Sequence, residues 1–590
     1  MLRPANDRLN YGNLLTPPPD YKTDFALGTT FGLDLEALVG IPMALFLSED
    51  MNKGTATNEI VMLEGLRNSA ERFAIMCEAG QIKAPHKLNV IFSLLENSVF
   101  EVALPKERSF HPKIWLIRYV NQKKQPLYRL ITLSRNLTFD RSWDLAVCLE
   151  GTLKEAETSK NQPLMDFISF TVPYVKNWKK RNQIKQMVEE LTHIHFDPMH
   201  QHITDFWFHP IGVAGYQKPP EALFDTYKDL LVISPFISKG MVQRFDKLAL
   251  TKATKTLVTR RSEISKLSEE LLSSFQVYAM KEMVVEGEEG LSGEELEEEL
   301  YQQQDIHAKL YAWSKYNQHS FFIGSANCSE KAFHGNIEFL LQLQYKKWGF
   351  RMQQLLDELF GKEDKENPFE LIETFPVTED SDEDLADQLQ KWIKQLCRMN
   401  TKATVSQEGN LYIITIEITR VPEGCEFLIS PIAGPQETVL DKVTVIRHVQ
   451  LEQLSEFYRV TASKDGVSVS RIIKIKTIGI PAERDKALFR KVINSRDAFM
   501  QYMAYLLSDN LLLATLEQPD GKHHGAGKWE GGWQYTAVLY ESMLKIVSRE
   551  PERMKEIERV MKLIDDPAII PDEFKSLYSD FEKVARKVKP

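Results

Sequence analysis

The sequence carries one short pattern of polar residues twice. The first copy runs from His111-Pro112-Lys113 to the turn Ser134-Arg135-Asn136, and the second runs from His307-Ala308-Lys309 to the turn Ser325-Ala326-Asn327. In both copies the His-x-Lys opens an apolar run, and the Ser-x-Asn turn follows a second apolar run. Residues i and i+2 of a strand share a face, so each histidine is expected to point the same way as its lysine. Such a repeat predicts two copies of one structural unit.

The repeated residues are the types that a metal-free cleavage of a phosphodiester requires. One imidazole attacks phosphorus and forms a phosphoramidate that water later hydrolyses. A second histidine protonates the leaving oxygen and then activates the water. Two lysines and two asparagines would hold the non-bridging oxygens and stabilise the added charge of the transition state. The predicted catalytic residues are therefore His111, Lys113, Asn136, His307, Lys309 and Asn327, with Ser134 and Ser325 as supporting residues.

The segments around both copies alternate between strand-like and helical patterns. In the first unit, residues 21–50 predict a strand that leads into a helix, 88–92, 114–117 and 128–133 predict strands, and 164–191 predicts a helical segment. The second unit repeats this order, with strands predicted at 230–236, 256–259, 310–313 and 320–323 and a helix at 240–250. Strands that alternate with helices predict an α/β layer fold with a parallel or mixed sheet in each half.

The length of 590 residues is too great for one hydrophobic core and predicts several domains. Alternating segments at 410–418, 441–449 and 467–475 predict a small antiparallel β domain, and the pattern from 484 onward is helical. The expected boundaries are 1–205 for the first half, 206–375 for the second half, 376–482 for the β-rich domain and 483–590 for the helical C-terminal domain.

The chain resembles the phospholipase D superfamily, whose motif is His-x-Lys followed by a turn that bears asparagine. The match is strongest in the second copy, residues 307–343, which contains the turn Gly324-Ser325-Ala326-Asn327 and the later Glu338. The first copy, residues 111–151, is looser, because Arg135 lies in its turn and Asp144 takes the place of Glu338. The resemblance covers about residues 20–350. It implies two αβα sandwich halves related by a pseudo-twofold axis, with one histidine from each half at a shared site.

The resemblance also implies roles for these residues. The histidine of the first half is the usual nucleophile of the family, which assigns that role to His111 and the acid and base role to His307. The reverse assignment fits the pseudo-symmetry nearly as well. Glu338 and Asp144 would orient the imidazoles through their far nitrogen. Neither a metal ion nor another cofactor is expected, because the chemistry of the motif requires none.

One departure from the family pattern bears on the substrate. Many members have an aspartate five residues after the lysine, where this chain has Arg118 and Ser314. The chain is therefore more similar to the tyrosyl-DNA phosphodiesterase and restriction-type nuclease branches, which use His, Lys and Asn. Its C-terminal regions resemble the tails of some bacterial phospholipase D-like nucleases near defence genes. We therefore expect a nuclease that cleaves DNA or RNA through a phosphohistidine, with a role in anti-phage defence.

Two other classes of function stay open at this point. A phospholipase D or phosphatidyltransferase that acts on lipid would share the site. A catalytically silent scaffold that binds nucleic acid would share the fold. The three tryptophans Trp115, Trp143 and Trp313 lie on strands of the two units, where aromatic residues more often belong to the core than stack on bases.

Charge is distributed unevenly along the chain. The net charge of −10 depends on a glutamate run at 282–299 and an acidic stretch at 363–387. The run at 282–299 is expected to be a solvated loop, with shielding of the site as the alternative. Basic faces at 176–185 and 244–255 are candidates to track a nucleic-acid backbone. The residues expected to bind nucleic acid are Lys179, Lys180, Arg181 and Arg135.

Several further patterns predict location and exclude other sites. No apolar run is long enough to span a membrane, and the N-terminus lacks the apolar core of a signal peptide, so a cytoplasmic protein without membrane contact is expected. The five cysteines have no CxxC spacing and are expected to be reduced. The histidines at 193–202 and the GKHHGAGK segment at 521–528 are more typical of loops than of a metal or phosphate site. A protein partner or a homo-oligomer through the C-terminal domains is expected.

Overall fold

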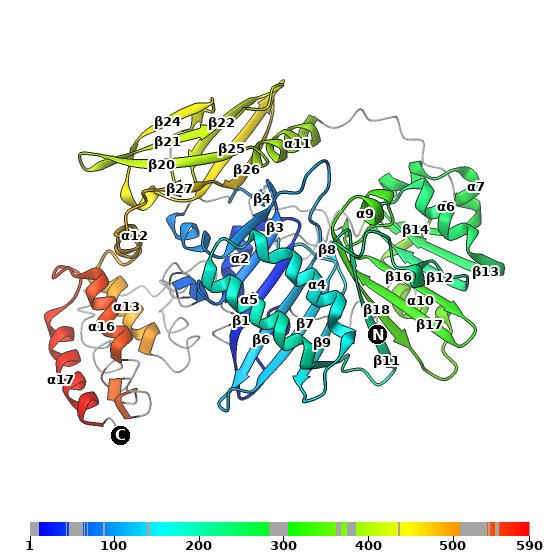
Figure 1. Ribbon diagram of the computed structural model, residues 1–590, viewed down its shortest axis with the longest axis horizontal. Coiled ribbons are helices and arrows are strands. Elements are labelled where there is room, and N and C mark those ends of the chain that lie inside the picture. The colour runs from blue at the N-terminus through cyan, green and yellow to red at the C-terminus, as the bar shows by residue number, and fades with distance from the viewer. Residues whose placement is uncertain are drawn as a thin grey trace, which may run out of the picture.

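The computed structural model shows two α/β halves, a β-rich region and a group of C-terminal helices (Figure 1). It describes residues 11–42, 44–45, 63, 65–67, 69–85, 89–138, 142–281, 305–361, 367–373, 385–434, 437–507, 540, 543–544, 546–548 and 554–588. The acidic run at 282–299 and the segment 521–528 lie outside the described residues.

The first half is built on a seven-stranded mixed sheet. From edge to edge its strands are β10 (Ile194–Asp197), β9 (Ala146–Leu153), β7 (Pro126–Leu133), β6 (Ile114–Asn121), β1 (Tyr21–Thr30), β3 (Phe73–Glu78) and β5 (Val99–Val102). β1, β3 and β5 are parallel to one another, whereas the pairs from β1 through β6, β7 and β9 to β10 are antiparallel. The first His-x-Lys directly precedes β6, at the centre of this sheet.

The second half repeats the same strand order in an eight-stranded sheet. Its strands are β11 (Ile203–Ile211), β18 (Glu338–Tyr345), β17 (Gln318–Gly324), β16 (Leu310–Lys315), β12 (Tyr227–Ile233), β13 (Ala249–Val258), β14 (Gln276–Met280) and β19 (Phe369–Leu371). β12, β13 and β14 are parallel, like β1, β3 and β5. The second His-x-Lys lies immediately before β16, as the first lies before β6. The predicted α/β fold class is confirmed.

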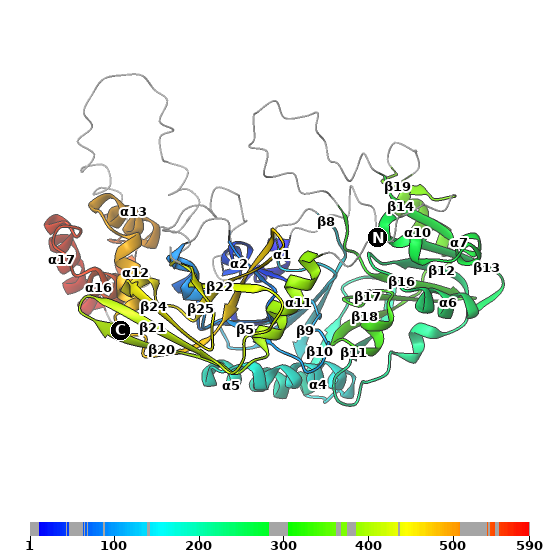
Figure 2. The ribbon, with the colours of Figure 1, turned by 90° about the horizontal axis from the view of Figure 1, so that it is seen from above.

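Both faces of each sheet carry apolar side chains, so helices cover the sheets. α4 (Gln162–Thr171) and α5 (Trp178–Glu190) lie along one face of the first sheet, and α1 (Tyr11–Leu15) and α2 (Leu35–Pro42) lie on the other (Figure 2). Phe25 and Leu27 of β1 pack in the core that includes α4, while Ala26 packs in the core that includes α2. The helices of the second half are α6 (Lys239–Lys247), α7 (Glu269–Ser274), α9 (Glu330–His334) and α10 (Met352–Phe360).

The two halves share one hydrophobic core. Phe167 of α4 and Phe339 of β18 have ring centroids 5.1 Å apart, and both are fully buried. The same core contains apolar residues of β6 and β7 from the first sheet and of β16 and β17 from the second. Burial of this shared surface stabilises the halves as a pair and fixes how the two motif copies face each other.

The β-rich region consists of two sheets packed on a common core. One sheet has the order β26 (Val467–Lys474), β25 (Phe457–Lys464), β22 (Glu426–Pro431) and β23 (Thr438–Val439), and β2 (Leu33–Asp34) and β4 (Ile82–Lys83) extend it at the β26 edge. The other sheet contains β24 (Val443–Val449), β21 (Leu411–Ile418), β20 (Thr401–Glu408) and β27 (Lys476–Ile478). α11 (Leu385–Cys397) packs against β25 and β26 through Leu389, Ile393 and Leu396.

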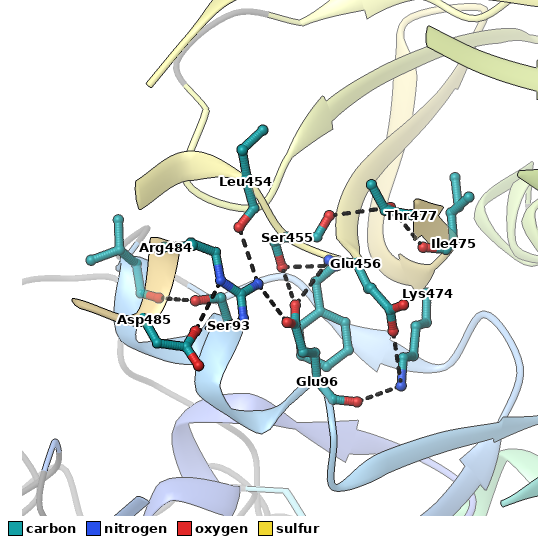
Figure 3. Close-up of polar contacts among 12 residues, drawn as sticks. Ser93, Glu96, Leu454, Ser455, Glu456, Lys474, Ile475, Thr477, Arg484 and Asp485 are labelled. Atoms are coloured by element: carbon teal, nitrogen blue, oxygen red, sulfur yellow. Dashed lines mark hydrogen bonds and ion pairs between the residues drawn. The ribbon is translucent and has the colours of Figure 1, made fainter. Parts of the chain in front are cut away.

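A buried polar network joins the first half to the β-rich region (Figure 3). Glu96 is almost fully buried, and its carboxylate accepts hydrogen bonds from Ser455 and from the guanidinium of Arg484. Nearby, Glu101 accepts a 2.8 Å hydrogen bond from the backbone N–H of Lys474. Buried carboxylates are stable only when they are paired in this way, so the contact constrains how the β-rich region sits on the first half.

The C-terminal helices pack around a small core that also includes Leu63 of the first half. They are α12 (Arg484–Val492), α13 (Arg496–Leu507), α16 (Met554–Ile564) and α17 (Asp572–Val588). Phe499 of α13 and Phe574 of α17 meet with ring centroids 5.0 Å apart. Among the helices of the described residues, none combines the length and apolar character needed to cross a membrane.

Two details of the sequence prediction differ from the structure. The strand expected at 88–92 is wrong, because Val90–Leu95 form a 3-10 helix (η2). Its cap is Asn89, whose side-chain oxygen accepts a 3.0 Å hydrogen bond from the N–H of Ile91 and so favours a helical turn over a strand. In addition, the expected boundary between residues 205 and 206 falls inside β11, which pairs with β18 in the second sheet.

Candidate active site

Backbone pairing across the halves positions both histidines. The short strands β15 (Asp305–Ile306) and β8 (Ser142–Trp143) pair in parallel, and the N–H of His307 donates to the carbonyl of Trp143 over 3.1 Å. In the other direction, the N–H of His111 donates to the carbonyl of Ile337 over 2.9 Å. Trp143 and Ile337 directly precede Asp144 and Glu338. Each histidine is therefore tied to the segment that carries the carboxylate of the opposite half.

Glu338 contacts the first histidine across this junction. Its Oε2 lies 2.9 Å from Nδ1 of His111, and the Glu338 side chain is fully buried. The hydroxyl of Ser325 donates to the same oxygen, and the amide of Asn336 donates to Oε1 over 3.1 Å. The predicted contact between Glu338 and an imidazole is present, and the histidine concerned belongs to the opposite half. Asn336 stands two residues before Glu338 in the segment that resembles the family, but the sequence analysis assigned it no role in the site.

Asp144 is held by a matching set of hydroxyl groups. Ser134 donates to its Oδ1 over 3.2 Å, and Ser142 donates to Oδ2. The Ser134 hydroxyl also accepts the N–H of Leu145 at 2.8 Å, as the Ser325 hydroxyl accepts the N–H of the residue after Glu338. The serines of the two Ser-x-Asn turns therefore make equivalent hydrogen bonds to the two carboxylates and to the backbone N–H of the residues that follow them.

The two lysines lie close to the histidines and are nearly inaccessible. Lys113 and Lys309 are 2% and 4% exposed. Nζ of Lys113 lies 3.1 Å from Nε2 of His111, and Nζ of Lys309 donates to the carbonyl of His307 over 2.6 Å. Burial lowers the pKa of Lys309 to about 8, and burial together with the charge of Lys309 holds the pKa of Lys113 well below its usual value.

The protonation of His111 follows from these surroundings. Burial, together with the charges of Lys113 and Lys309, lowers the pKa of His111 to about 4 against the opposing effect of Glu338. The imidazole is therefore neutral near pH 7. With its Nδ1–H directed at Glu338, the lone pair of Nε2 faces Nζ of Lys113 at 3.1 Å.

The two asparagines lie beside the loops that follow β1 and β12, which occupy matching places in the two sheets. Oδ1 of Asn136 accepts the N–H of Gly32 over 3.4 Å. Oδ1 of Asn327 is buried and accepts no hydrogen bond from the residues that the structure describes. An unpaired buried acceptor is costly, so a donor from a bound molecule or water fits this position.

A second group of residues holds the segment before His111, and sequence reasoning missed it. Glu78 is fully buried and accepts the N–H of Phe110 over 2.6 Å, while Lys394 of α11 forms an ion pair with the same carboxylate. Nζ of Lys394 also donates to the carbonyl of Arg108 over 2.9 Å and to the hydroxyl of Ser109 over 2.8 Å. The one available signal was a lone glutamate at the end of an otherwise apolar strand.

The expected nucleic-acid contact of Lys180 is wrong. This residue is fully buried, and its ammonium donates to the carbonyls of Phe73 and Asn97 over 2.8 and 2.7 Å and to the hydroxyl of Ser98 over 3.0 Å. Burial lowers its pKa to about 7. Lys180 lies on the inner face of α5, where its hydrogen bonds are used within the protein, so it cannot reach a phosphate group.

The other three basic candidates are at least partly accessible. Lys179 is exposed, whereas Arg181 and Arg135 are half-buried. The guanidinium of Arg181 donates to the carbonyl of Val175 over 2.7 Å, and that of Arg135 donates to the carbonyl of Thr138 over 2.8 Å. Contact of these residues with nucleic acid stays a prediction.

The remaining polar and aromatic candidates lie apart from the site or in the core. His200 and His202 pack near Tyr345, and His195 contacts the carbonyl of Ala156. Within the described residues, no three or more His, Cys, Asp or Glu side chains are grouped as metal ligands. Trp115 and Trp313 are buried core residues, and the half-buried ring of Trp143 packs edge-on against Phe369.

Comparisons with known proteins support the resemblance. Residues 221–359 match the family described as the NgoFVII restriction endonuclease N-terminal PLD domain. No curated protein matches the sequence. Among solved structures, yeast tyrosyl-DNA phosphodiesterase is similar at 13% identity and a TM-score of 0.37, over 58% of this chain and 88% of that chain. Phosphatidylserine synthase of Haemophilus influenzae Rd KW20 is similar at 11% identity and a TM-score of 0.34, over 65% and 88%.

The matched segment contains the second copy of the motif in full. It includes His307, Lys309, Asn327 and Glu338 and most of the second sheet. The first half has the same strand order but lies outside the matched residues. Residues 221–359 thus match a family of phospholipase D-type domains, in agreement with the resemblance seen in the sequence.

Proposed function

We propose that the protein is a metal-independent phosphodiesterase that cleaves nucleic acid through a covalent phosphohistidine. The observation that supports this most is the contact between Glu338 of the second half and Nδ1 of His111 in the first. It leaves Nε2 of a neutral imidazole beside Lys113, in a site that also holds the motif of the second half. The restriction endonuclease family matched by residues 221–359 favours DNA as the substrate, with RNA as the alternative.

The reaction proceeds in two steps. Nε2 of His111 attacks phosphorus, the bond to the leaving oxygen breaks, and His307 gives that oxygen a proton. His307 then takes a proton from water, the hydroxide attacks phosphorus, and the bond to Nε2 breaks. Lys113 and Lys309 stabilise the charge on the non-bridging oxygens, and Asn136 and Asn327 would hold these oxygens in place.

The first test is cleavage without metal. Labelled single-stranded DNA, double-stranded DNA, RNA and a phospholipid vesicle are each incubated with the protein in EDTA. We expect cleavage of nucleic acid and its loss in His307→Ala by at least about a thousandfold. Strict dependence on added metal would refute the mechanism. Cleavage of phospholipid alone would favour a lipid-acting enzyme.

A second test assigns the nucleophile. A p-nitrophenyl diester has a leaving group that needs no protonation, so the first step can proceed without the general acid. If His111 is the nucleophile, His307→Ala releases about one equivalent of p-nitrophenol and stalls as a phosphoenzyme, whereas His111→Ala releases none. The opposite pattern would assign the nucleophile to His307.

The proposal includes a role in bacterial defence against phage, which rests on the resemblance to nucleases near defence genes. Expression of the chain in a susceptible host should lower the plating of some phages. The effect should disappear in His307→Ala at equal protein level. Equal protection by this variant would instead favour a scaffold that binds nucleic acid without cleaving it.

A further inference from the structure

The loops after β1 and β12 place different residues at one matching position of the site. The Thr30 hydroxyl donates to the carbonyl of Gly32 over 2.7 Å. The Ser234 hydroxyl donates to the carbonyl of Phe236 over the same distance. Both hydroxyl residues end or directly follow the matching strands of the two sheets. Gly32 and Phe236 are therefore equivalent in the two halves.

The same hydroxyl groups tie these loops to the two Ser-x-Asn turns. The N–H of Leu137 donates to the Thr30 hydroxyl over 3.0 Å. The N–H of Cys328 donates to the Ser234 hydroxyl over 2.9 Å. Leu137 and Cys328 directly follow the two motif asparagines. Phe236 therefore lies beside the asparagine of the second motif copy, as Gly32 lies beside that of the first.

The residues after β3 and β13 also differ, with glycine in the first half and a larger side chain in the second. Ala79 and Thr259 follow β3 and β13, and each donates its N–H to the next parallel strand, β5 or β14. Their successors, Gly80 and Arg260, are therefore equivalent. Glycine thus occupies both positions in the first half, whereas the second half has an aromatic ring and a guanidinium group.

Phe236 and Arg260 lie together at the edge of the site. The Phe236 side chain is 44% exposed, and the Arg260 guanidinium carbon is 4.5 Å from the ring centroid. The guanidinium also contacts the carbonyl of Ile306 at 3.5 Å, directly before His307. Its charge is one of those that act on the buried ammonium of Lys309. An exposed aromatic ring can stack on a base, and a guanidinium group beside it can contact phosphate, so the pair suits a planar ligand that carries phosphate.

We propose that Phe236 and Arg260 form a nucleotide subsite that binds one side of the scissile phosphodiester. The Phe236 ring stacks on the base, and the Arg260 guanidinium contacts the phosphate or sugar of that nucleotide. Because glycine occupies both matching positions in the first half, the nucleotide on that side is held without stacking. The site therefore binds its substrate with one polarity. This inference rests on the proposed phosphodiesterase function and names its substrate more closely.

Three chromogenic diesters test the subsite. Thymidine 5′-(p-nitrophenyl phosphate) and thymidine 3′-(p-nitrophenyl phosphate) attach the base through the 5′ or the 3′ oxygen, opposite the p-nitrophenol leaving group, and methyl p-nitrophenyl phosphate has no base. We expect the protein to favour one thymidine ester over the methyl ester. Phe236→Leu should lower kcat/KM on that ester by about tenfold, the size of one base–aromatic contact, and change the methyl ester less than about twofold. Phe236→Tyr keeps a ring and should keep the preference.

A matched control is Tyr316→Leu, which removes an exposed ring from the turn between β16 and β17 and should leave all three rates unchanged. The subsite is overturned if the thymidine preference survives in Phe236→Leu or if all three esters slow equally. Absence of cleavage of every ester by the wild type would overturn the proposed function instead. In that case, calorimetric binding of thymidylyl-thymidine still decides the subsite: weaker binding by Phe236→Leu supports it, and equal binding refutes it.

Discussion

The two halves of the site share a strand order and a hydrogen-bonding plan but differ in what supports them. In each half a serine of the Ser-x-Asn turn donates to a carboxylate, and the segment that carries this carboxylate binds the backbone of the opposite histidine. The interior of the site is therefore nearly symmetric. The surroundings are not, because the first half is also joined to the β-rich region and the C-terminal helices (Figures 1 and 3).

A pair of buried carboxylates illustrates the difference. Glu78 accepts the N–H of Phe110 and is paired with Lys394, an almost buried lysine from α11 of the β-rich region. In the second half, Glu263 accepts the N–H of Ile237 over 2.8 Å and is paired with Lys266, a half-exposed lysine from the same turn. The segment before His111 is thus held by a distant part of the chain. The position of His111, the proposed nucleophile, therefore depends on contacts made by the β-rich region.

The largest expected effect comes from the two carboxylates. Glu338→Gln should lower kcat by about a hundredfold or more, because an amide NH2 group facing Nδ1 would hold His111 in the opposite tautomer, with its proton on Nε2. Asp144→Asn should lower it by about tenfold, since Asp144 is half-buried and the amide can still accept from the Ser134 hydroxyl and donate to that of Ser142. Steady-state rates on a p-nitrophenyl diester measure both variants. Equal losses of kcat in the two variants would mean that Glu338 and Asp144 have equivalent catalytic roles, as their hydrogen bonds from serine are equivalent.

The next effect concerns the ion pairs outside the site. Lys394→Met leaves Glu78 buried without its partner, which should cost about 3 kcal/mol and lower Tm by several degrees. It should also lower kcat by about tenfold through displacement of the segment before His111. Lys266→Met is the matched control, and it should cost less than about 1 kcal/mol because Lys266 is half-exposed.

A double variant separates stability from positioning in this pair. Glu78→Gln combined with Lys394→Met removes both charges, so much of the lost Tm should return. If Lys394 positions the segment before His111, kcat should stay low in the double variant, because the hydrogen bonds to Arg108 and Ser109 are still missing. Recovery of kcat together with Tm would show that Lys394 acts through stability alone.

Much of this arrangement could be predicted from the sequence because it depends on local patterns. The apolar runs at 114–117, 128–133 and 320–323 became strands, and the repeat of His, Lys, Ser and Asn around them located the site. The carboxylates after each turn, Glu338 and Asp144, were indicated by the resemblance to the phospholipase D superfamily. These features lie within about forty residues of one another in each copy, where strand periodicity and turn residues carry the information.

The rest could not be predicted because it depends on distant partners. Nothing near Lys394 in the sequence indicates that its ammonium binds the segment before His111. The same reason explains the error at Lys180, which looks like a surface lysine until α5 is packed against the first sheet. Phe236 and Arg260 escaped notice because their importance appears only when the two halves are compared position by position.

The pH dependence tests the coupling between the halves. A histidine with an ordinary pKa of about 6.5 would be mostly protonated at pH 5 and lose most of its nucleophilic activity there. Because the pKa of His111 is lowered to about 4, this residue stays neutral at pH 5. We therefore expect kcat/KM on a phosphodiester to change less than about threefold between pH 7 and 5 and to fall steeply near pH 4.

A Lys309→Met variant provides a control for this pH profile, because Lys309 belongs to the second half. Lys309 is one of the charges that lower the pKa of His111, so Lys309→Met should move the acid limb to higher pH even though its maximal rate is reduced. A limb that stays in place would mean that the second half does not act on the protonation of the first-half histidine.

The smallest expected effect is at Gly32, the counterpart of Phe236. A Cβ atom at this position would lie 3.6 Å from Nδ2 of Asn136 and 3.9 Å from Cγ2 of Thr138, which are ordinary contact distances. Gly32→Ala should therefore change kcat/KM on the thymidine diesters by less than about twofold, within the usual range for a substitution that creates no clash. A loss as large as that of Phe236→Leu would contradict the comparison between the halves. It would mean that the first half needs glycine to admit the second nucleotide, and that the open side of the site selects the substrate as strongly as the aromatic side.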